Sequence, residues 1–159
     1  MISQGNHFLI RRCRIEDLDR VYEIERSSFE DAWPKFSLDY LFGLESSGFF
    51  VAEADGKVIG YAIVTIERTL LKPWKAFGHL LNIAVDPEFR GKGIGYQLLD
   101  AMRAMAARNG ITVQTLEVRA SNQAAINLYQ KCGFVVKGIR PHYYNDTDED
   151  ALIMWADVR

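Results

Sequence analysis

Two β-rich runs joined by an Asp-Gly turn constrain this chain more than any other feature of its sequence. Residues 49–54 and 58–66 are rich in β-branched, aromatic and small apolar side chains, and Asp55-Gly56 separates them. An Asp-Gly pair between two such runs predicts a tight β-hairpin. A third β-rich run, residues 79–85, follows without an intervening helical pattern, which predicts a three-strand meander. A doubly wound fold is therefore excluded, because it places a helix between successive strands.

The segments on either side of this meander alternate between helical and strand patterns. Apolar residues at near-helical spacing predict two helices before it, and an apolar stripe predicts a helix directly after it. Ser121-Asn122 and Gly133 suit the start and the end of a further helix. The expected strands are 8–10, 49–54, 58–66, 79–85, 112–118, 134–139 and 151–156, the expected helices are 18–29, 36–44, 94–109 and 123–131, and 67–78 is an expected loop. This order predicts a mixed α/β fold that forms a single domain over residues 1–159.

The bulk composition is typical of a globular protein and argues against several functions. The 159 residues suit one domain, with 48% hydrophobic and 25% charged residues. A formal net charge of -2 provides no broad positive field for nucleic acid, and no apolar run approaches the ~18 residues of a membrane span. Cys13 and Cys132 are too few for a disulfide framework and lack the spacing of a zinc site, so no metal is expected. Residues 1–14 lack a secretion signal, and the expected location is cytoplasmic.

A glycine-rich loop, residues 86–95, joins the third strand of the meander to the next helix. Its glycines allow backbone N–H groups to converge on a ligand, and the helix adds a partial positive charge at its N-terminus. Arg90 and Lys92 can neutralise a pyrophosphate, although an ordinary turn with two solvated cations would look similar. A Rossmann fingerprint needs a small residue where Tyr96 stands, and a P-loop ends differently from Gly95-Tyr96-Gln97. The spacing therefore favours another class of phosphate binder.

The chain resembles the GNAT acetyltransferases in this loop and in the strand before it. Arg90-Gly91-Lys92-Gly93-Ile94-Gly95 matches the Arg/Gln-x-x-Gly-x-Gly/Ala loop that holds the CoA pyrophosphate, and Leu81 to Pro87 is similar to the strand that binds the pantetheine arm. The resemblance implies a GNAT fold, a splayed and mostly antiparallel sheet of about seven strands flanked by about four helices, with acetyl-CoA as cofactor. The residues that it assigns to acetyl-CoA are Ile83, Ala84, Val85, Arg90, Gly91, Lys92, Gly93, Ile94, Gly95, Tyr96, Asn122 and Tyr129.

The second half of the chain is similar to the RimI-type enzymes that acetylate protein N-termini. Residues 116–129, continuing to Gly133-Phe134, match the RimI signature almost residue for residue, and residues 140–144 and 149–151 match its ending. These matches imply that the chain transfers acetyl from acetyl-CoA to the α-amino group of a protein or peptide N-terminus, by direct attack in a ternary complex. The implied acceptors are a ribosomal-protein alanine or nascent chains, which makes the ribosome an expected partner.

Acetyl transfer to an amine requires a neutral nucleophile, a polarised thioester and a proton for the departing thiolate. The resemblance assigns the general base to Glu117 and the general acid to Tyr129, with His79 as a further candidate for proton transfer. Each residue also has a plainer interpretation. Glu117 would then be a solvent-facing strand residue, Tyr129 a packed core aromatic, and His79 a structural residue at a strand end. Neither cysteine matches the position of a covalent nucleophile.

The acceptor site is expected to form from two segments that are distant in sequence. Tyr143-Tyr144 resembles the aromatic pair that lines the peptide slot, and relatives build the opposite wall where Glu30, Asp31 and Trp33 stand. Carboxylates and aromatic faces suit a cationic amine. Packing on the protein core is the alternative role for each aromatic residue.

Three other functions compete with this interpretation. A GNAT enzyme could instead acetylate lysine side chains or small-molecule amines, but Tyr143-Tyr144 favours a peptide. A CoA-binding sensor or partner-binding module would bind CoA without turnover, whereas Glu117 and Tyr129 favour an enzyme. A nucleotide-binding regulator would show competition of ATP or NAD against CoA. The sequence leaves open whether the protein is a monomer or a homodimer, and which first residue of the acceptor it prefers.

Overall fold

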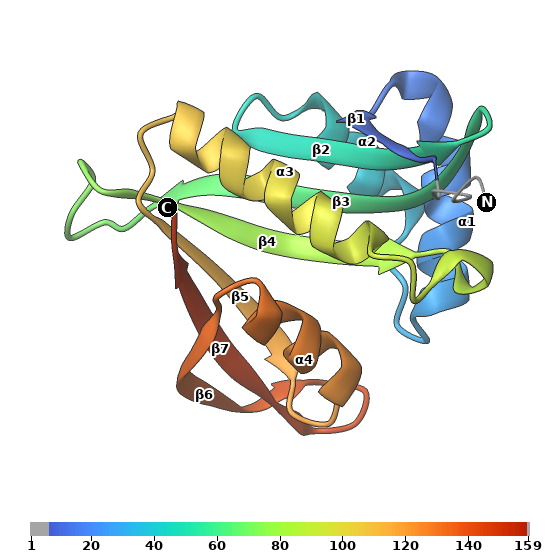
Figure 1. The fold of residues 1–159 in the computed structure, drawn as a ribbon. Coiled ribbons are helices and arrows are strands. Elements are labelled where there is room, and N and C mark those ends of the chain that lie inside the picture. The colour runs from blue at the N-terminus through green and yellow to red at the C-terminus, as the bar shows by residue number, and fades with distance from the viewer. Residues whose placement is uncertain (1–6, 159) are drawn as a thin grey trace, which may run out of the picture.

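The computed structural model describes residues 7–158. They form seven strands and four α-helices in the predicted order, with short 3-10 helices η1 (Ile15–Asp17) and η2 (Pro87–Phe89) (Figure 1). The strands are β1 (Leu9–Arg12), β2 (Ser47–Ala54), β3 (Lys57–Arg68), β4 (Ala76–Val85), β5 (Val113–Arg119), β6 (Val135–Tyr144) and β7 (Glu149–Asp157). The α-helices are α1 (Leu18–Ser28), α2 (Lys35–Gly43), α3 (Ile94–Arg108) and α4 (Gln123–Lys131).

The strands form one sheet in the order β1-β2-β3-β4-β5-β7-β6. Neighbouring strands are antiparallel except β4 and β5, which are parallel and pair only from Gly78 to Leu80. The register of β4 against β3 shifts between Leu80 and Asn82, so Leu81 is an extra residue. A bulge of this kind bends its strand, and this one lies where β4 leaves β5. The sheet splays open from that point, as predicted (Figure 1).

Helices cover both faces of the part of the sheet formed by β1–β4, with α3 on one face and α1 and α2 on the other (Figure 1). Side chains alternate between the two faces of a strand. On β2, Phe50 and Ala52 join the core beneath α3, whereas Phe49 and Val51 join the core beneath α1 and α2. Because both faces are buried, the sequence of β2 is nearly continuously apolar. No helix within residues 7–158 is long and apolar enough to cross a membrane.

The local signals for turns and helix ends are confirmed. Asp55 and Gly56 have φ values of 50° and 77°, so both central residues of the hairpin turn are left-handed. Asn122 caps α4, because its side-chain oxygen accepts a hydrogen bond from Ala125 N–H at 3.2 Å. Gly133 follows α4 with a φ of 90°, a conformation that glycine adopts without strain.

The expected loop over residues 67–78 is wrong at both ends. β3 continues to Arg68 and β4 begins at Ala76, and these two residues are opposite each other in the sheet. Hydrogen bonding between strands extends both of them beyond their apolar runs. His79 consequently lies inside β4 and not at its start.

The last two strands are also longer than predicted. β6 continues to Tyr144 and β7 begins at Glu149, and these residues are paired. Tyr143 and Tyr144 therefore belong to a strand and not to a loop. The register of β6 shifts between Arg140 and Tyr144, and His142 within this irregular stretch has a φ of 54°. Such bulges redirect side chains near functional sites.

Candidate active site

The fork between β4 and β5 brings His79 and Glu117 together. His79 lies opposite Thr115 in the short parallel contact. Its Nδ1 lies 2.6 Å from Thr115 Oγ1, and its Nε2 lies 3.0 Å from Glu117 Oε2. Thr115 and Glu117 are two residues apart and share one face of β5. Two of the three expected proton-transfer residues are therefore in direct contact.

These contacts determine the tautomer of neutral His79. An ionised carboxylate only accepts hydrogen bonds, so the hydrogen stands on Nε2 and is donated to Glu117. Nδ1 then accepts a hydrogen bond from the Thr115 hydroxyl. Thr115 was not among the residues expected from the sequence, yet its hydroxyl orients the imidazole.

Glu117 is a largely buried carboxylate, with 16% of its side chain exposed. Its Oε1 lies 3.3 Å from Arg140 Nε. The hydrogen bond with His79 is the main cause that lowers the pKa of Glu117; burial opposes this, and the charge of Arg140 adds to it. Glu117 is therefore ionised at neutral pH, the form in which a carboxylate can accept a proton. Its burial excludes the plainer interpretation of a solvent-facing side chain.

Tyr129 lies on α4 and is almost fully buried, with 6% of its surface exposed. Its ring packs edge to face on Phe134, with the ring centroids 6.0 Å apart. Burial raises the pKa of its phenol, so the hydroxyl keeps its proton at neutral pH. Such a phenol suits a proton donor, and the same packing also suits a core aromatic.

The glycine-rich loop contains backbone conformations that favour glycine. Gly91 and Gly93 have φ values of 77° and 82°, and no atom lies within 4 Å of the place where a Cβ would stand at either. Gly93 is the N-cap of α3, whose first turn carries free N–H groups. At Gly95 a Cβ would stand only 2.9 Å from Leu128 of α4. Gly95 thus allows α3 and α4 to approach each other, and the two earlier glycines leave room for a ligand.

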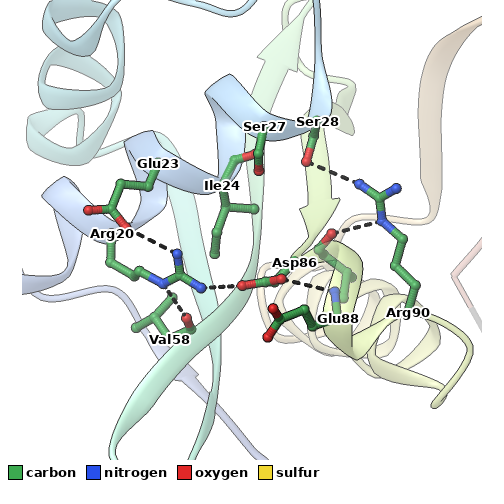
Figure 2. A network of polar contacts seen from close by, with 10 residues as sticks. Arg20, Glu23, Ile24, Ser27, Ser28, Val58, Asp86, Glu88 and Arg90 are labelled. Atoms are coloured by element: carbon green, nitrogen blue, oxygen red, sulfur yellow. Dashed lines mark hydrogen bonds and ion pairs between the residues drawn. The ribbon is translucent and has the colours of Figure 1, made fainter.

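Polar contacts hold the glycine-rich loop to α1 (Figure 2). Arg90 donates from Nε to the Val85 carbonyl at 3.0 Å and from Nη2 to Ser28 Oγ at 3.3 Å. Asp86, where β4 ends, forms an ion pair with Arg20 of α1. Arg90 therefore contributes positive charge at the loop and also positions the loop against the rest of the molecule.

Lys92 in the loop and Tyr96 just after it both have exposed side chains. Lys92 Nζ lies 5.3 Å from the centroid of the Phe89 ring. Tyr96 is 47% exposed in the first turn of α3, and the adjoining Ile94 is buried in the core. Lys92, Gly93 and Tyr96 line a hollow of about 730 Å³ that extends to β1. Both exposed side chains can therefore meet a ligand at the helix N-terminus.

The edge of β4 that faces β5 has no partner strand beyond Leu80 in the described part of the chain. Ile83, Ala84 and Val85 lie on this stretch, so their backbone groups that point toward this edge have no partner on β5. Ile83 N–H donates to the side-chain oxygen of Asn82 at 3.1 Å. A ligand that takes this donor would replace that local hydrogen bond.

The aromatic pair expected to line the acceptor slot lies beside the fork. Tyr143 and Tyr144 contact each other edge to face, with ring centroids 5.0 Å apart. The Arg140 guanidinium lies 6.0 Å from the Tyr143 ring centroid and also contacts Glu117. The structure therefore connects the pair to the expected base through one side chain.

The segment between α1 and α2 carries the residues expected to form the opposite wall. Trp33 and the bulged residue Leu81 of β4 line one apolar groove of about 500 Å³. The backbone N–H of Trp33 donates to the Glu25 carboxyl group of α1 at 3.0 Å, which holds the segment in place. Asp31 Oδ2 lies 2.9 Å from Arg119 Nη2 of β5, whereas Glu30 is exposed. The segment thus reaches both strands of the fork.

Comparison with known proteins shows the family of this chain. Residues 18–134 match the acetyltransferase (GNAT) family, which is well over half of the chain. The chain belongs to the GNAT acetyltransferase family. The seven-stranded GNAT fold expected from the sequence is confirmed.

Individual relatives of this GNAT protein align over nearly its whole length. An N-alpha-acetyltransferase of Sulfurisphaera tokodaii is 40% identical in an alignment of 167 positions that covers 98% of this chain and 96% of that protein. The ribosomal protein bS18-alanine N-acetyltransferase of Escherichia coli is 36% identical over 143 residues, covering 87% and 89% of the two chains. A crystal structure of the Escherichia coli ribosomal-protein-S18-alanine enzyme has a TM-score of 0.83 and 32% identity, covering 96% of this chain and 94% of that one.

GNAT enzymes use acetyl-CoA, and the residues of this GNAT site fit it. The left-handed glycines at the start of α3 offer open space and N–H donors to a pyrophosphate, with Arg90 and Lys92 nearby. The unpaired edge of β4 offers backbone groups to the amides of a pantetheine arm. Asn122 is used as the α4 cap, so its residue type is explained without a CoA contact.

Three residues of the GNAT site were not assigned a role from the sequence. Thr115 and Arg119 flank Glu117 at two-residue spacing on β5, and the strand period alone would place all three on one face. Arg140 had no comparable signal, because β6 reaches Glu117 only through its pairing with β7, which in turn pairs with β5.

Proposed function

We propose that this GNAT protein transfers the acetyl group of acetyl-CoA to the α-amino group of a protein or peptide N-terminus. The observation that carries the proposal is the ionised Glu117 at the fork, bonded to His79 and adjoining the Tyr143-Tyr144 pair through Arg140. The names of the relatives support an α-amine acceptor. The proposed enzyme is a single domain over residues 1–159, and its acceptor is a ribosomal protein or a nascent chain in the cytoplasm.

Acetyl-CoA supplies the activated acetyl group, and the acceptor amine attacks it directly. In our proposal Glu117 attracts the acceptor ammonium and accepts its proton, directly or through water. The lowered pKa of Glu117 makes it a weak base. A weak base is sufficient, because a protein α-amino group has an ordinary pKa of about 7.7 to 8.0 and is partly neutral at pH 7. His79, held by Thr115, orients this carboxylate.

Tyr129 is the proposed proton donor to the departing thiolate. Its buried phenol is protonated at neutral pH, and α4 places it in the same core as the end of β5. The proposed acetyl-CoA contacts are the main chain of Ile83 to Val85 and the loop from Arg90 to Tyr96. Trp33, Tyr143 and Tyr144 are the proposed walls for the first residues of the peptide.

The proposal is tested by mass spectrometry of short peptides after incubation with acetyl-CoA. The peptides have free or blocked N-termini, varied first residues and one internal lysine. We expect acetylation only at free α-amines, and a rate about 100-fold lower for Glu117→Gln, which keeps the shape of the side chain but cannot accept the proton. Glu45→Gln, at an exposed position between α2 and β2, is the matched control and should keep the wild-type rate.

Three outcomes would contradict the proposal. Acetylation of lysine side chains alone, or of small amines and no peptide, would make the protein a GNAT enzyme with another acceptor. Binding of CoA without acetylation of any amine would make it a CoA sensor. Competition of ATP or NAD against CoA in the same binding assay would indicate a nucleotide-binding regulator.

A further inference from the structure

Arg119, the last residue of β5, makes polar contacts with both walls of the proposed acceptor slot. Its Nη2 lies 2.9 Å from Asp31 Oδ2, in the segment between α1 and α2. The same nitrogen lies 2.9 Å from Asp146 Oδ2, in the turn between β6 and β7. Its Nη1 donates to Thr147 Oγ1 at 3.1 Å. One guanidinium group therefore joins segments that are distant in the sequence.

The Arg119 guanidinium is also stacked on an aromatic residue of the slot. Its Cζ lies 4.0 Å from the centroid of the Tyr144 ring, within the range of a cation–π contact. Only 22% of the Arg119 side chain is exposed. Arginine suits such a position, because its planar group can stack on a ring and donate from its edge at the same time.

Arg119 lies close to the proposed chemistry. It follows Glu117 by two residues, so both side chains are on one face of β5 at roughly 7 Å along the strand. An acceptor whose amine reaches Glu117 therefore lies close to Arg119. The acidic groups around the guanidinium are Asp31, Asp146 and, at 3.8 Å, Glu149. Without Arg119, three carboxylates would repel one another at the entrance.

We propose that Arg119 is a positioning residue that sets the width of the acceptor slot, by pairing with Asp31 across it. The inference rests on the proposed function and gives Asp31 a role that differs from direct binding of the substrate ammonium. While Asp31 is paired with Arg119, its Oδ2 already accepts a hydrogen bond from the guanidinium. Asp146, Thr147 and Tyr144 hold the guanidinium on its own wall, and the Asp31 contact fixes the other wall at one distance.

Asp31→Asn tests the pairing in steady-state kinetics. We expect the KM for a good peptide to rise about threefold to fivefold, the range of a partly exposed ion pair, with the KM for acetyl-CoA and kcat unchanged. Asp19→Asn is the matched control. Asp19 pairs with Lys35 at 2.5 Å, a contact that joins α1 and α2 but does not cross the slot. The peptide KM of Asp19→Asn should therefore stay at the wild-type value. Equal changes of the peptide KM in Asp31→Asn and Asp19→Asn would overturn the proposal.

Arg119→Met separates positioning from direct binding of the ammonium. If Arg119 holds the slot, this variant raises the peptide KM, and adding Asp31→Asn causes no further increase, because the ion pair is already lost. If Asp31 binds the ammonium directly, Arg119→Met frees its charge and lowers the peptide KM. Arg119→Lys is the second variant in case the first does not fold. It keeps the charge but lacks the planar fork, and it should also raise the peptide KM.

Hydrogen–deuterium exchange tests the pairing without any substrate. Asp31→Asn should accelerate amide exchange in both walls, residues 29–34 and 144–149, and Asp19→Asn should not. Unchanged exchange in both walls would overturn the inference even in a protein that acetylates no peptide. Faster exchange together with absent peptide acetylation would leave the Arg119 contact supported and refute the proposed function alone.

Discussion

Glu25 is the residue whose surroundings differ most from what its chemistry favours. It lies on the buried face of α1 with 1% of its surface exposed. Three donors converge on its carboxyl group, namely the Tyr61 hydroxyl, the Asn82 side-chain amide at 2.7 Å and the Trp33 backbone N–H at 3.0 Å. A buried polar group is tolerated when its hydrogen bonds are made. Glu25 thereby links the segment carrying Trp33 to β4 at the bulge.

Glu25→Gln should destabilise the protein although it preserves the volume of the side chain. The amide keeps one acceptor oxygen and directs an NH2 group at donors that need an acceptor. The expected loss is about 1 to 3 kcal/mol in the free energy of unfolding, measured with urea. Tyr61→Phe, which removes one donor and leaves the carboxyl group intact, should cost less. A Glu25→Gln variant as stable as the wild type would show that the network can rearrange.

The glycine-rich loop and α3 act as one element, anchored to α1 through Arg90 and through the Asp86–Arg20 ion pair. The anchoring explains how a loop with left-handed glycines can present a defined set of N–H groups. Its glycines have two different roles, because Gly93 faces open space and Gly95 faces Leu128. Both glycines belong to the same sequence motif, so their roles can be told apart only from the packing around each of them.

Gly93→Ala should weaken binding of CoA. The φ of 82° costs an L-residue about 1 to 2 kcal/mol, and the added methyl group occupies the space next to the helix N-terminus. We expect the Kd of CoA, measured by calorimetry, to rise about tenfold or more. Gly133→Ala is the control, because its φ is 90°, its surroundings are equally open and it follows α4, outside the glycine-rich loop. If both variants bind CoA alike, the loop is not the phosphate site.

At the scale of the whole molecule, the two parts of the sheet are joined by little backbone pairing. β4 and β5 share three residue pairs, and the parts are otherwise linked by side chains such as His79 with Glu117 and Arg119 with Asp31. The fork is thus a consequence of the topology. Stability rests on the buried cores on both faces of the sheet and on ion pairs at its rim.

The Arg11–Asp17 pair should make stability depend on pH. Asp17 accepts two hydrogen bonds from Arg11, at 2.7 and 3.0 Å, and these are the main cause that lowers its pKa below 3.8; burial opposes them. A lowered pKa in the folded state means that this stabilisation is complete above about pH 4 and is lost as the pH falls through the lowered value. Asp17→Asn should therefore cost about 1 to 3 kcal/mol at pH 7, and less in acid.

Urea unfolding at pH 7 and at pH 3 measures this difference. The difference in the free energy of unfolding between the wild type and Asp17→Asn should be smaller at pH 3 than at pH 7. Asp19→Asn, with an 82% exposed side chain on the adjoining helix, should change stability by less than about 0.5 kcal/mol at pH 7. If this difference for Asp17→Asn stayed constant with pH, the pH dependence of stability could not be assigned to the Asp17 carboxylate.

Features that depend on a few neighbouring residues were predictable from the sequence alone. The hairpin at Asp55-Gly56, the cap at Asn122 and the glycine after α4 follow from local backbone preferences, and the order of strands and helices follows from periodicity. The GNAT motifs indicated the family for the same reason, since a phosphate-binding loop is a continuous segment. Strand ends were predicted too short, because strand pairing continues beyond the apolar residues.

Only the tertiary structure decided which side chains meet. Glu25 and Asn82 are 57 positions apart, and Arg119 and Asp31 are 88 positions apart. Their contacts depend on the register of β4, on the bulge at Leu81 and on the way β7 brings β6 to β5. The register, the bulge and the strand pairing are set by the packing of the whole sheet against its helices. The sequence by itself therefore determined the elements and the family, and packing determined the partners of Glu117 and the contact between Arg119 and Asp31.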